Sequence, residues 1–233
     1  MERNVLDFLA AAPFVIPWYA FGLIAAAWVV YDEYTANKHV NQALKWAWPI
    51  IVFFFSVLGL VAYLLTCRPP DIEDLEGEEA KKVHHEYVKV QWKKVFGSVT
   101  HCVGGDGLGI VTAMIAARLL DFSFWAEFWL EYAVGFAFGW FIFQLKAMLN
   151  AGNPFWQALW KAGRAEFFSM FTVMAGMGFV MRYVTPAVLN GGSPDPNEPA
   201  FWGFAMLGLL VGTLVTYPMN WWLVARGWKH GMS

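Results

Sequence analysis

The sequence predicts an all-α, polytopic membrane bundle with six transmembrane helices, and three observations lead to that fold class. Of the 233 residues, 58% are hydrophobic and only 15% are charged, whereas soluble domains have about half and about a quarter. The apolar residues form continuous blocks without the alternation of a membrane barrel strand, so the blocks should be helices. Lys and Arg residues gather in alternate connections between the blocks, which is typical of multi-pass proteins.

Six apolar runs are long enough, or nearly so, to cross ~30 Å of hydrocarbon, which takes about 20 helical residues. In chain order they are Pro13–Tyr31, Trp46–Thr66, Phe96–Leu120, Phe124–Phe143, Phe167–Leu189 and Phe201–Val224. The third run is the weakest, because it contains polar residues and a cluster of glycines. We therefore expect this helix to be buried among its neighbours.

Positive charge predicts how the spans are oriented. With six spans, the side that holds both chain ends carries all but four of the 16 Lys and Arg residues. The four exceptions are Lys38, Lys45, Arg118 and Arg182. Because cytoplasmic segments are enriched in Lys and Arg, both termini are predicted to be cytoplasmic. The chain is expected to be a multi-pass protein of the inner (cytoplasmic) membrane.

The pattern divides the chain into three parts. Residues 1–66 form two N-terminal transmembrane helices, 67–94 a charged cytoplasmic connector, and 95–233 a four-helix membrane domain. Two prolines follow Arg68 and end the second span, and Asp71 is a suitable N-cap for a connector helix. Its acidic first half and basic second half match the helix dipole. We expect this helix to continue into the third span, with His84 and His85 exposed to solvent.

Composition also bears on function classes. The net charge of −2 argues against nucleic acid as a partner, and the lipid bilayer is the expected surrounding. Two cysteines are too few for a disulfide scaffold. No nucleophile–base arrangement or cofactor motif appears, so the chain is predicted not to be an enzyme.

The third span begins with a group of residues that can carry chemistry. His101, Cys102 and Asp106 fall within six residues, and ionisable groups in a membrane helix must find partners or face water. Cys102 and Asp106 share one helical face, and His101 lies on the adjacent one. Such groups can ligate a cuprous or divalent ion, or relay protons through the histidine. The neighbouring Gly104, Gly105 and Gly109 are expected to serve helix packing.

Other spans bring polar groups to a similar depth. Glu166 stands at the start of the fifth span, which continues with a methionine stripe that includes Met177. Thioethers suit cuprous ion, although methionine is also a common gap-filler in apolar packing. Gln144 and Asn220 are expected to give polar support. The candidate metal ligands are therefore His101, Cys102, Asp106, Glu166 and Met177.

Several short motifs occur in order along the second half of the chain. They are the run from His101 to Ile110, Phe143-Gln144, Ala165-Glu166-x-x-Ser169, Gly176-Met177 and Pro218-Met219-Asn220-Trp221-Trp222-Leu223 with Gly227 and Lys229. This series resembles the prokaryotic membrane-protein family known as domain of unknown function 4396, over roughly Lys94 to Met232. The family hallmark is His-Cys-x-x-Gly-Cys-x-x-Gly-Asp. Here Asp106 stands at the second cysteine position and Ile110 at the final acid.

The resemblance implies a shared topology and a shared His-Cys site, without an established reaction. Some family members look associated with copper-handling proteins, so copper is the first metal to consider. Asp106 departs from that expectation, because it puts a hard oxygen ligand where the family has a thiol. A changed metal preference and a packing role therefore both stay open.

Three function classes follow from the sequence. The first is a protein that binds or transports a transition metal, copper first, at a cytoplasmic-side site. The second is a non-catalytic accessory subunit of a larger membrane complex, for which the aromatic content of 18% would provide partner-helix contacts. The third is a proton-coupled transporter that uses the same histidine and carboxylates. Metal content and co-purifying subunits would separate these classes.

Overall fold

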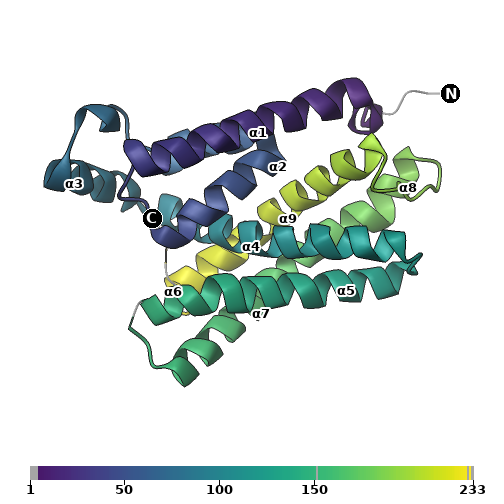
Figure 1. The fold of residues 1–233 in the computed structure, drawn as a ribbon. Helices are drawn as coiled ribbons and strands as arrows, with labels where there is room; N and C mark the ends of the chain where they lie inside the picture. The colour runs from purple at the N-terminus through teal and green to yellow at the C-terminus, as the bar shows by residue number, and fades with distance from the viewer. Residues whose placement is uncertain (1–4, 151, 230, 232–233) are drawn as a thin grey trace.

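The computed structural model is entirely helical and describes residues 5–150, 152–229 and 231 (Figure 1). In chain order the elements are η1 (Asp7–Ala10), α1 (Ala12–Thr35), α2 (Gln42–Thr66), η2 (Ile72–Asp74), α3 (Gly77–Val88), α4 (Gln91–Leu119), α5 (Phe124–Ala137), η3 (Phe138–Gln144), α6 (Leu145–Asn150), α7 (Phe155–Phe179), η4 (Val180–Val184), α8 (Thr185–Val188) and α9 (Pro199–Ala225). The segments η3 and η4 are π-helical, and each continues the helix before it.

The prediction of six helical segments long and apolar enough to span a membrane is confirmed. They are Ala12–Thr35, Gln42–Thr66, Gln91–Leu119, Phe124–Asn150, Phe155–Val188 and Pro199–Ala225. The helix α4 is the central element, because it packs against α2, α5, α7 and α9. Glycines allow these close approaches: Gly104 lies against Ala47 of α2, and Gly109 lies against Gly135 of α5.

The apolar run of α2 reverses direction within its length. Ser56 has φ 50° and ψ −123°, which is outside the helical region. A Cβ on Gly59 would lie 2.8 Å from the Cα of Val52, although seven residues of straight helix rise about 10 Å. The residues on either side of Ser56 therefore form two limbs of a helical hairpin that pack side by side.

The tip of this hairpin is buried against α1. The Ser56 hydroxyl donates a hydrogen bond to the Trp18 carbonyl at 2.7 Å, and the Trp18 indole N–H donates to the Phe54 carbonyl at 3.0 Å. Irregular backbone at membrane depth is tolerated where protein satisfies its polar groups. These two bonds meet that condition inside the bundle.

The second limb of the hairpin returns to the end of α1 from which the first limb started. Tyr63 donates a hydrogen bond to Asp32 at 2.6 Å, and Arg68 forms an ion pair with the same carboxylate at 2.9 Å. Asn37, in the α1–α2 connection, donates to the Cys67 carbonyl at 3.3 Å. Both ends of α2 therefore lie at one end of the bundle.

This reversal changes where the two ends of the chain lie. Leu9 of η1 packs against Gly203 at the start of α9, whereas Lys229 follows the end of α9. The two regions lie at opposite ends of the bundle (Figure 1). The prediction of two cytoplasmic termini assumed that α2 crosses the membrane without turning, and the orientation of the termini stays a prediction.

The connector also differs from its prediction. Asp71 adopts a left-handed conformation with φ 58°, and α3 begins at Gly77. The helix α3 ends before α4 begins at Gln91, so the connector helix does not continue into the span. His85 is exposed as expected, but His84 is buried and its Nδ1 lies 2.8 Å from Asn37 Oδ1. Burial lowers the pKa of His84 to about 4.

Candidate metal centre

Three buried side chains from two helices form the candidate centre. Cys102 and Asp106 come from α4 and Glu166 from α7, and their ligand atoms lie within 4.8 Å of one another. Cys102 Sγ is 3.1 Å from Asp106 Oδ2 and 3.5 Å from Glu166 Oε1. All three side chains are fully buried. The i, i+4 spacing on α4 puts the thiol and the carboxylate on one face, and α7 brings the second carboxylate to it.

A glycine in a π-helical segment makes room for the two carboxylates. A Cβ on Gly139, in η3, would collide with carboxylate oxygens of both Asp106 and Glu166. Single π-helical turns inside α-helices often occur at functional sites. The third wall of the centre is therefore the bare backbone of η3, and Gly139 was not among the predicted site residues.

A hydrogen-bonded chain of polar groups extends from the centre toward the end of α9. The Cys102 thiol donates to Ser169 Oγ at 3.0 Å, and Asn220 Nδ2 donates to the same oxygen at 2.8 Å. Lys229 Nζ donates to Asn220 Oδ1 at 2.7 Å and is itself buried. The Lys229 ammonium also donates to Ser169 Oγ at 3.4 Å, so it is joined to Cys102 through a single hydroxyl group.

The structure places some expected site residues away from this centre. His101 is buried on another face of α4, where its ring packs edge-on against Phe143 with centroids 5.2 Å apart. Met177 packs against Gly208 of α9, and eleven helical residues, or about 16 Å, separate it from Glu166. The side-chain amide of Gln144 is buried and makes no hydrogen bond to the described residues. The structure brings Asn220 to the centre through Ser169.

Gly139, Ser169 and Lys229 were not predicted as site residues, because the sequence gives only weak signals for them. Gly139 is one of 21 glycines and follows an aromatic run that looks like ordinary lipid-facing helix. Ser169 and Lys229 occur in the motifs of the family resemblance, but neither was expected to contact the site. Lys229 lies beyond the last span, so its return into the bundle depends on the turn that follows α9.

The model of the family described as domain of unknown function (DUF4396) matches residues 91–229, more than half of the chain. The chain belongs to this family. Its DUF4396 domain runs from α4 through α9 and contains every residue of the centre. Residues 20–66 are similar to a second family, described as phospholipase D-nuclease N-terminal, and cover most of α1 and the hairpin α2. No curated protein and no solved structure matches the chain.

Within this DUF4396 domain, the donor set determines which chemistry is available. One thiol and two carboxyl groups form a mixed sulfur–oxygen set, which suits zinc in tetrahedral sites. Asp106 Oδ1 is buried and accepts no hydrogen bond from an amide, hydroxyl or thiol group of the described residues. A buried carboxylate needs a cation or a proton to compensate it. The centre can therefore hold a metal ion or exchange protons.

Proposed function

We propose that this DUF4396 protein binds a divalent transition-metal ion, zinc first, at Cys102, Asp106 and Glu166. The observation that carries the proposal is the convergence of three fully buried ligand groups within 4.8 Å. A thiolate with two carboxylates is a borderline donor set that suits Zn²⁺. Cuprous ion prefers thiolate and thioether ligands, and Met177 lies too far along α7 to supply one. Zinc therefore takes precedence over copper.

A second feature favours movement of the ion over static storage. At the opposite end of α4, a cavity of about 280 Å³ is lined by Arg118, Asp121, Glu127 and Asp195 among others. Glu127, Glu131, Gly135 and Gly139 follow one another at four-residue spacing and share one face of the α5–η3 helix. This face leads from the cavity toward the centre.

Side chains close the path along this helix face between the cavity and the centre. A Cβ on Gly135 would meet Met170 Cε at 2.6 Å and Ile110 Cγ1 at 2.8 Å, so these side chains fill the space beside the glycine. A flexible methionine can change rotamer at small cost. We infer that Met170 separates the centre from the cavity and that a cation would pass only when it moves.

Proton transfer is the second candidate function, and one observation favours it. Lys229 Nζ donates to Ser169 Oγ at 3.4 Å, and the Cys102 thiol lies 3.0 Å from the same oxygen and 3.1 Å from Asp106 Oδ2. The hydroxyl and the thiol can each accept one proton and release another, so a proton could pass from Lys229 to the buried carboxyl pair without any metal. The two candidate functions share residues and differ in whether an ion is bound.

Metal content of the protein purified in mild detergent tests the proposal. After equilibration with Zn²⁺ and dialysis, the wild type should retain about one zinc per chain, and a Cys102→Ser, Asp106→Asn variant should retain almost none. Cys67→Ser is the matched control, because Cys67 is also a buried free cysteine but follows α2. Equal zinc in the wild type and the double variant would contradict the metal site. Proton flux into vesicles from metal-free protein would then favour the second candidate.

A further inference from the structure

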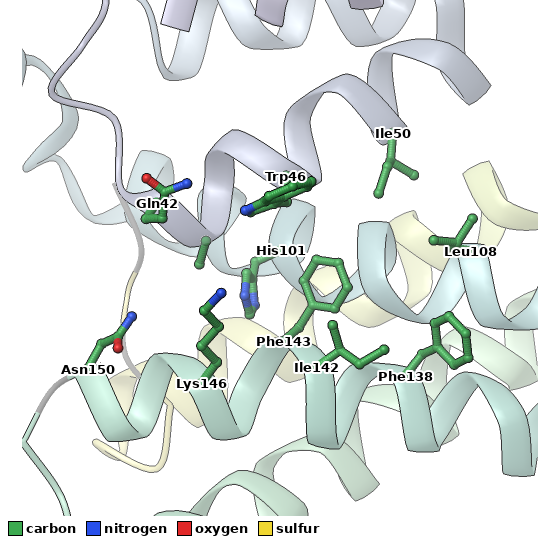
Figure 2. A pocket seen from close by; sticks show the side chains of 11 residues that line it. Gln42, Trp46, Ile50, His101, Leu108, Phe138, Ile142, Phe143, Lys146 and Asn150 are labelled. Carbon is green, nitrogen blue, oxygen red and sulfur yellow. The ribbon is translucent and has the colours of Figure 1, made fainter. Parts of the chain in front are cut away.

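A second cavity, separate from the metal centre, opens toward the lipid-facing side of the bundle. Its volume is about 310 Å³, and α2, α4 and the α5–α6 helix line it (Figure 2). Its apolar walls include Trp46, Ile50, Leu108, Phe138 and Ile142. Trp46 is 60% exposed and Ile142 is 52% exposed, so the mouth lies on the outer surface of the spans. A ligand would therefore enter from the bilayer.

A buried hydrogen-bonding group lines this apolar cavity. His101 is fully buried, and neither of its ring nitrogens has a hydrogen-bond partner among the described residues. A neutral imidazole carries one N–H donor, and a buried donor without an acceptor is unfavourable. Lys146 reaches the same end of the cavity from α6 (Figure 2). His101 and Lys146, together with the amides of Gln42 and Asn150, thus make one end of the cavity polar, while its other walls are apolar.

The depth of His101 restricts the ligand class. Seven residues of α4 separate it from Lys94, which is about 10 Å of helix rise inward from the charged end. Phospholipid phosphates stay in the interfacial region. A head group that reaches His101 must therefore be uncharged, because it enters hydrocarbon, and it must offer a hydrogen-bond acceptor.

We propose that this cavity binds a lipid-soluble quinone. A ring carbonyl would accept the hydrogen bond of His101, and Lys146 would donate to an oxygen at the same end. Trp46, Phe138 and Phe143 provide flat apolar surfaces for the ring. The hydrocarbon tail would leave past Ile142 into the bilayer. The metal ligands take no part in this site, so it does not depend on the proposed metal function.

Binding of decylubiquinone, a short-chain quinone, tests the proposal on the full-length protein in uncharged detergent. Quinones quench tryptophan fluorescence, and the quenching should saturate and shrink in Trp46→Phe. Ile142→Trp should abolish saturable binding by filling the cavity, while Leu214→Trp, on the exposed surface of α9, should leave it unchanged. His101→Leu should weaken binding about fivefold or more through the lost hydrogen bond, and His101→Gln should restore most of it.

Two outcomes would overturn the proposal. One is quenching that does not saturate or that is unchanged in both Ile142→Trp and His101→Leu. The other is saturable binding of oleate in place of the quinone, which would show that Lys146 recruits a fatty-acid carboxylate. Zinc content measured on the same samples keeps this test apart from that of the metal centre, because Ile142→Trp should leave the zinc content unchanged.

Discussion

Gly139 is the residue on which the geometry of the centre depends most strictly. Its missing side chain lets Asp106 and Glu166 lie against the backbone of η3. We predict that Gly139→Ala displaces both carboxylates, removes zinc binding and lowers stability by about 1–3 kcal/mol through overpacking. Zinc content and the thermal midpoint in detergent measure these two effects.

Gly107→Ala is the control for that substitution. A Cβ on Gly107 would meet only the two Leu209 methyl groups, at 3.2 and 3.6 Å, and this side chain can adjust. Zinc content should therefore stay at the wild-type value. If Gly139→Ala bound zinc as well as Gly107→Ala does, the carboxylates would not need the glycine, and the described geometry would be contradicted.

Part of the centre could be predicted from the sequence, because helical geometry determines which residues share a face. The i, i+4 spacing placed Cys102 and Asp106 on one face, and the depth of Glu166 in its span placed it nearby. His101 was harder to place, because successive helical residues point about 100° apart. Glycines occur on several faces of α4, so the pattern did not tell which face the second carboxylate would meet.

At the scale of elements, the hairpin of α2 has the largest consequence. It puts the α1–α2 connection and the α2–α4 connector at the same end of the bundle, where Asn37 contacts His84 at 2.8 Å. We predict that single cysteines at Lys38 and Lys81, both exposed, react with a membrane-impermeant maleimide from the same side. The background would carry Cys67→Ala and Cys102→Ala.

A cysteine at Ser193, exposed in the loop before α9, is the control and should react only from the opposite side. Labelling of the Lys38 and Lys81 positions from opposite sides would show that α2 crosses the membrane. Hydropathy could predict α2 as an apolar helix, because its residues from Trp46 onward are almost all apolar. It could not predict the reversal, which depends on one backbone conformation at Ser56 and on two hydrogen bonds to Trp18.

The docking of α3 should depend on pH through His84. The folded pKa is about 4, below the ordinary value of about 6.5, because burial, with His39, His85 and Lys45 nearby, disfavours the charged ring. Stability from docking is therefore complete above pH 6.5 and decreases as the pH falls toward about 4. Full protonation would cost on the order of 3 kcal/mol.

Hydrogen exchange of the α3 amides, corrected for intrinsic rates, measures this effect. Protection at pH 5 should be lower than at pH 7.5 in the wild type, and the difference should vanish in His84→Gln. His85→Gln, which changes an exposed neighbour, should keep the wild-type pH dependence. An unchanged profile in His84→Gln would assign the pH dependence to another group.

At the scale of the whole molecule, the hairpin sharpens the charge asymmetry. With both ends of α2 on one side, only Arg118 and Arg182 of the Lys and Arg residues that the structure describes fall on the other. Six crossings would put four of them there, so the hairpin increases the asymmetry. The positive-inside rule thus favours a bundle with five crossings.

We predict that the end of α9 faces the cytoplasm and that η1 faces the opposite side. Green fluorescent protein fused after the C-terminus should fluoresce, because it matures in the cytoplasm, and alkaline phosphatase at the same position should be inactive. The reverse pair of results would contradict the orientation while leaving the fold intact.

Cobalt substitution is the most direct test of a metal site made of Cys102, Asp106 and Glu166. Co²⁺ commonly replaces Zn²⁺, and bonding to a thiolate gives an intense charge-transfer band in the near ultraviolet. We expect a band that saturates at one Co²⁺ per chain, persists in Cys67→Ser and disappears in Cys102→Ser. No band in the wild type, or an equal band in Cys102→Ser, would contradict this site.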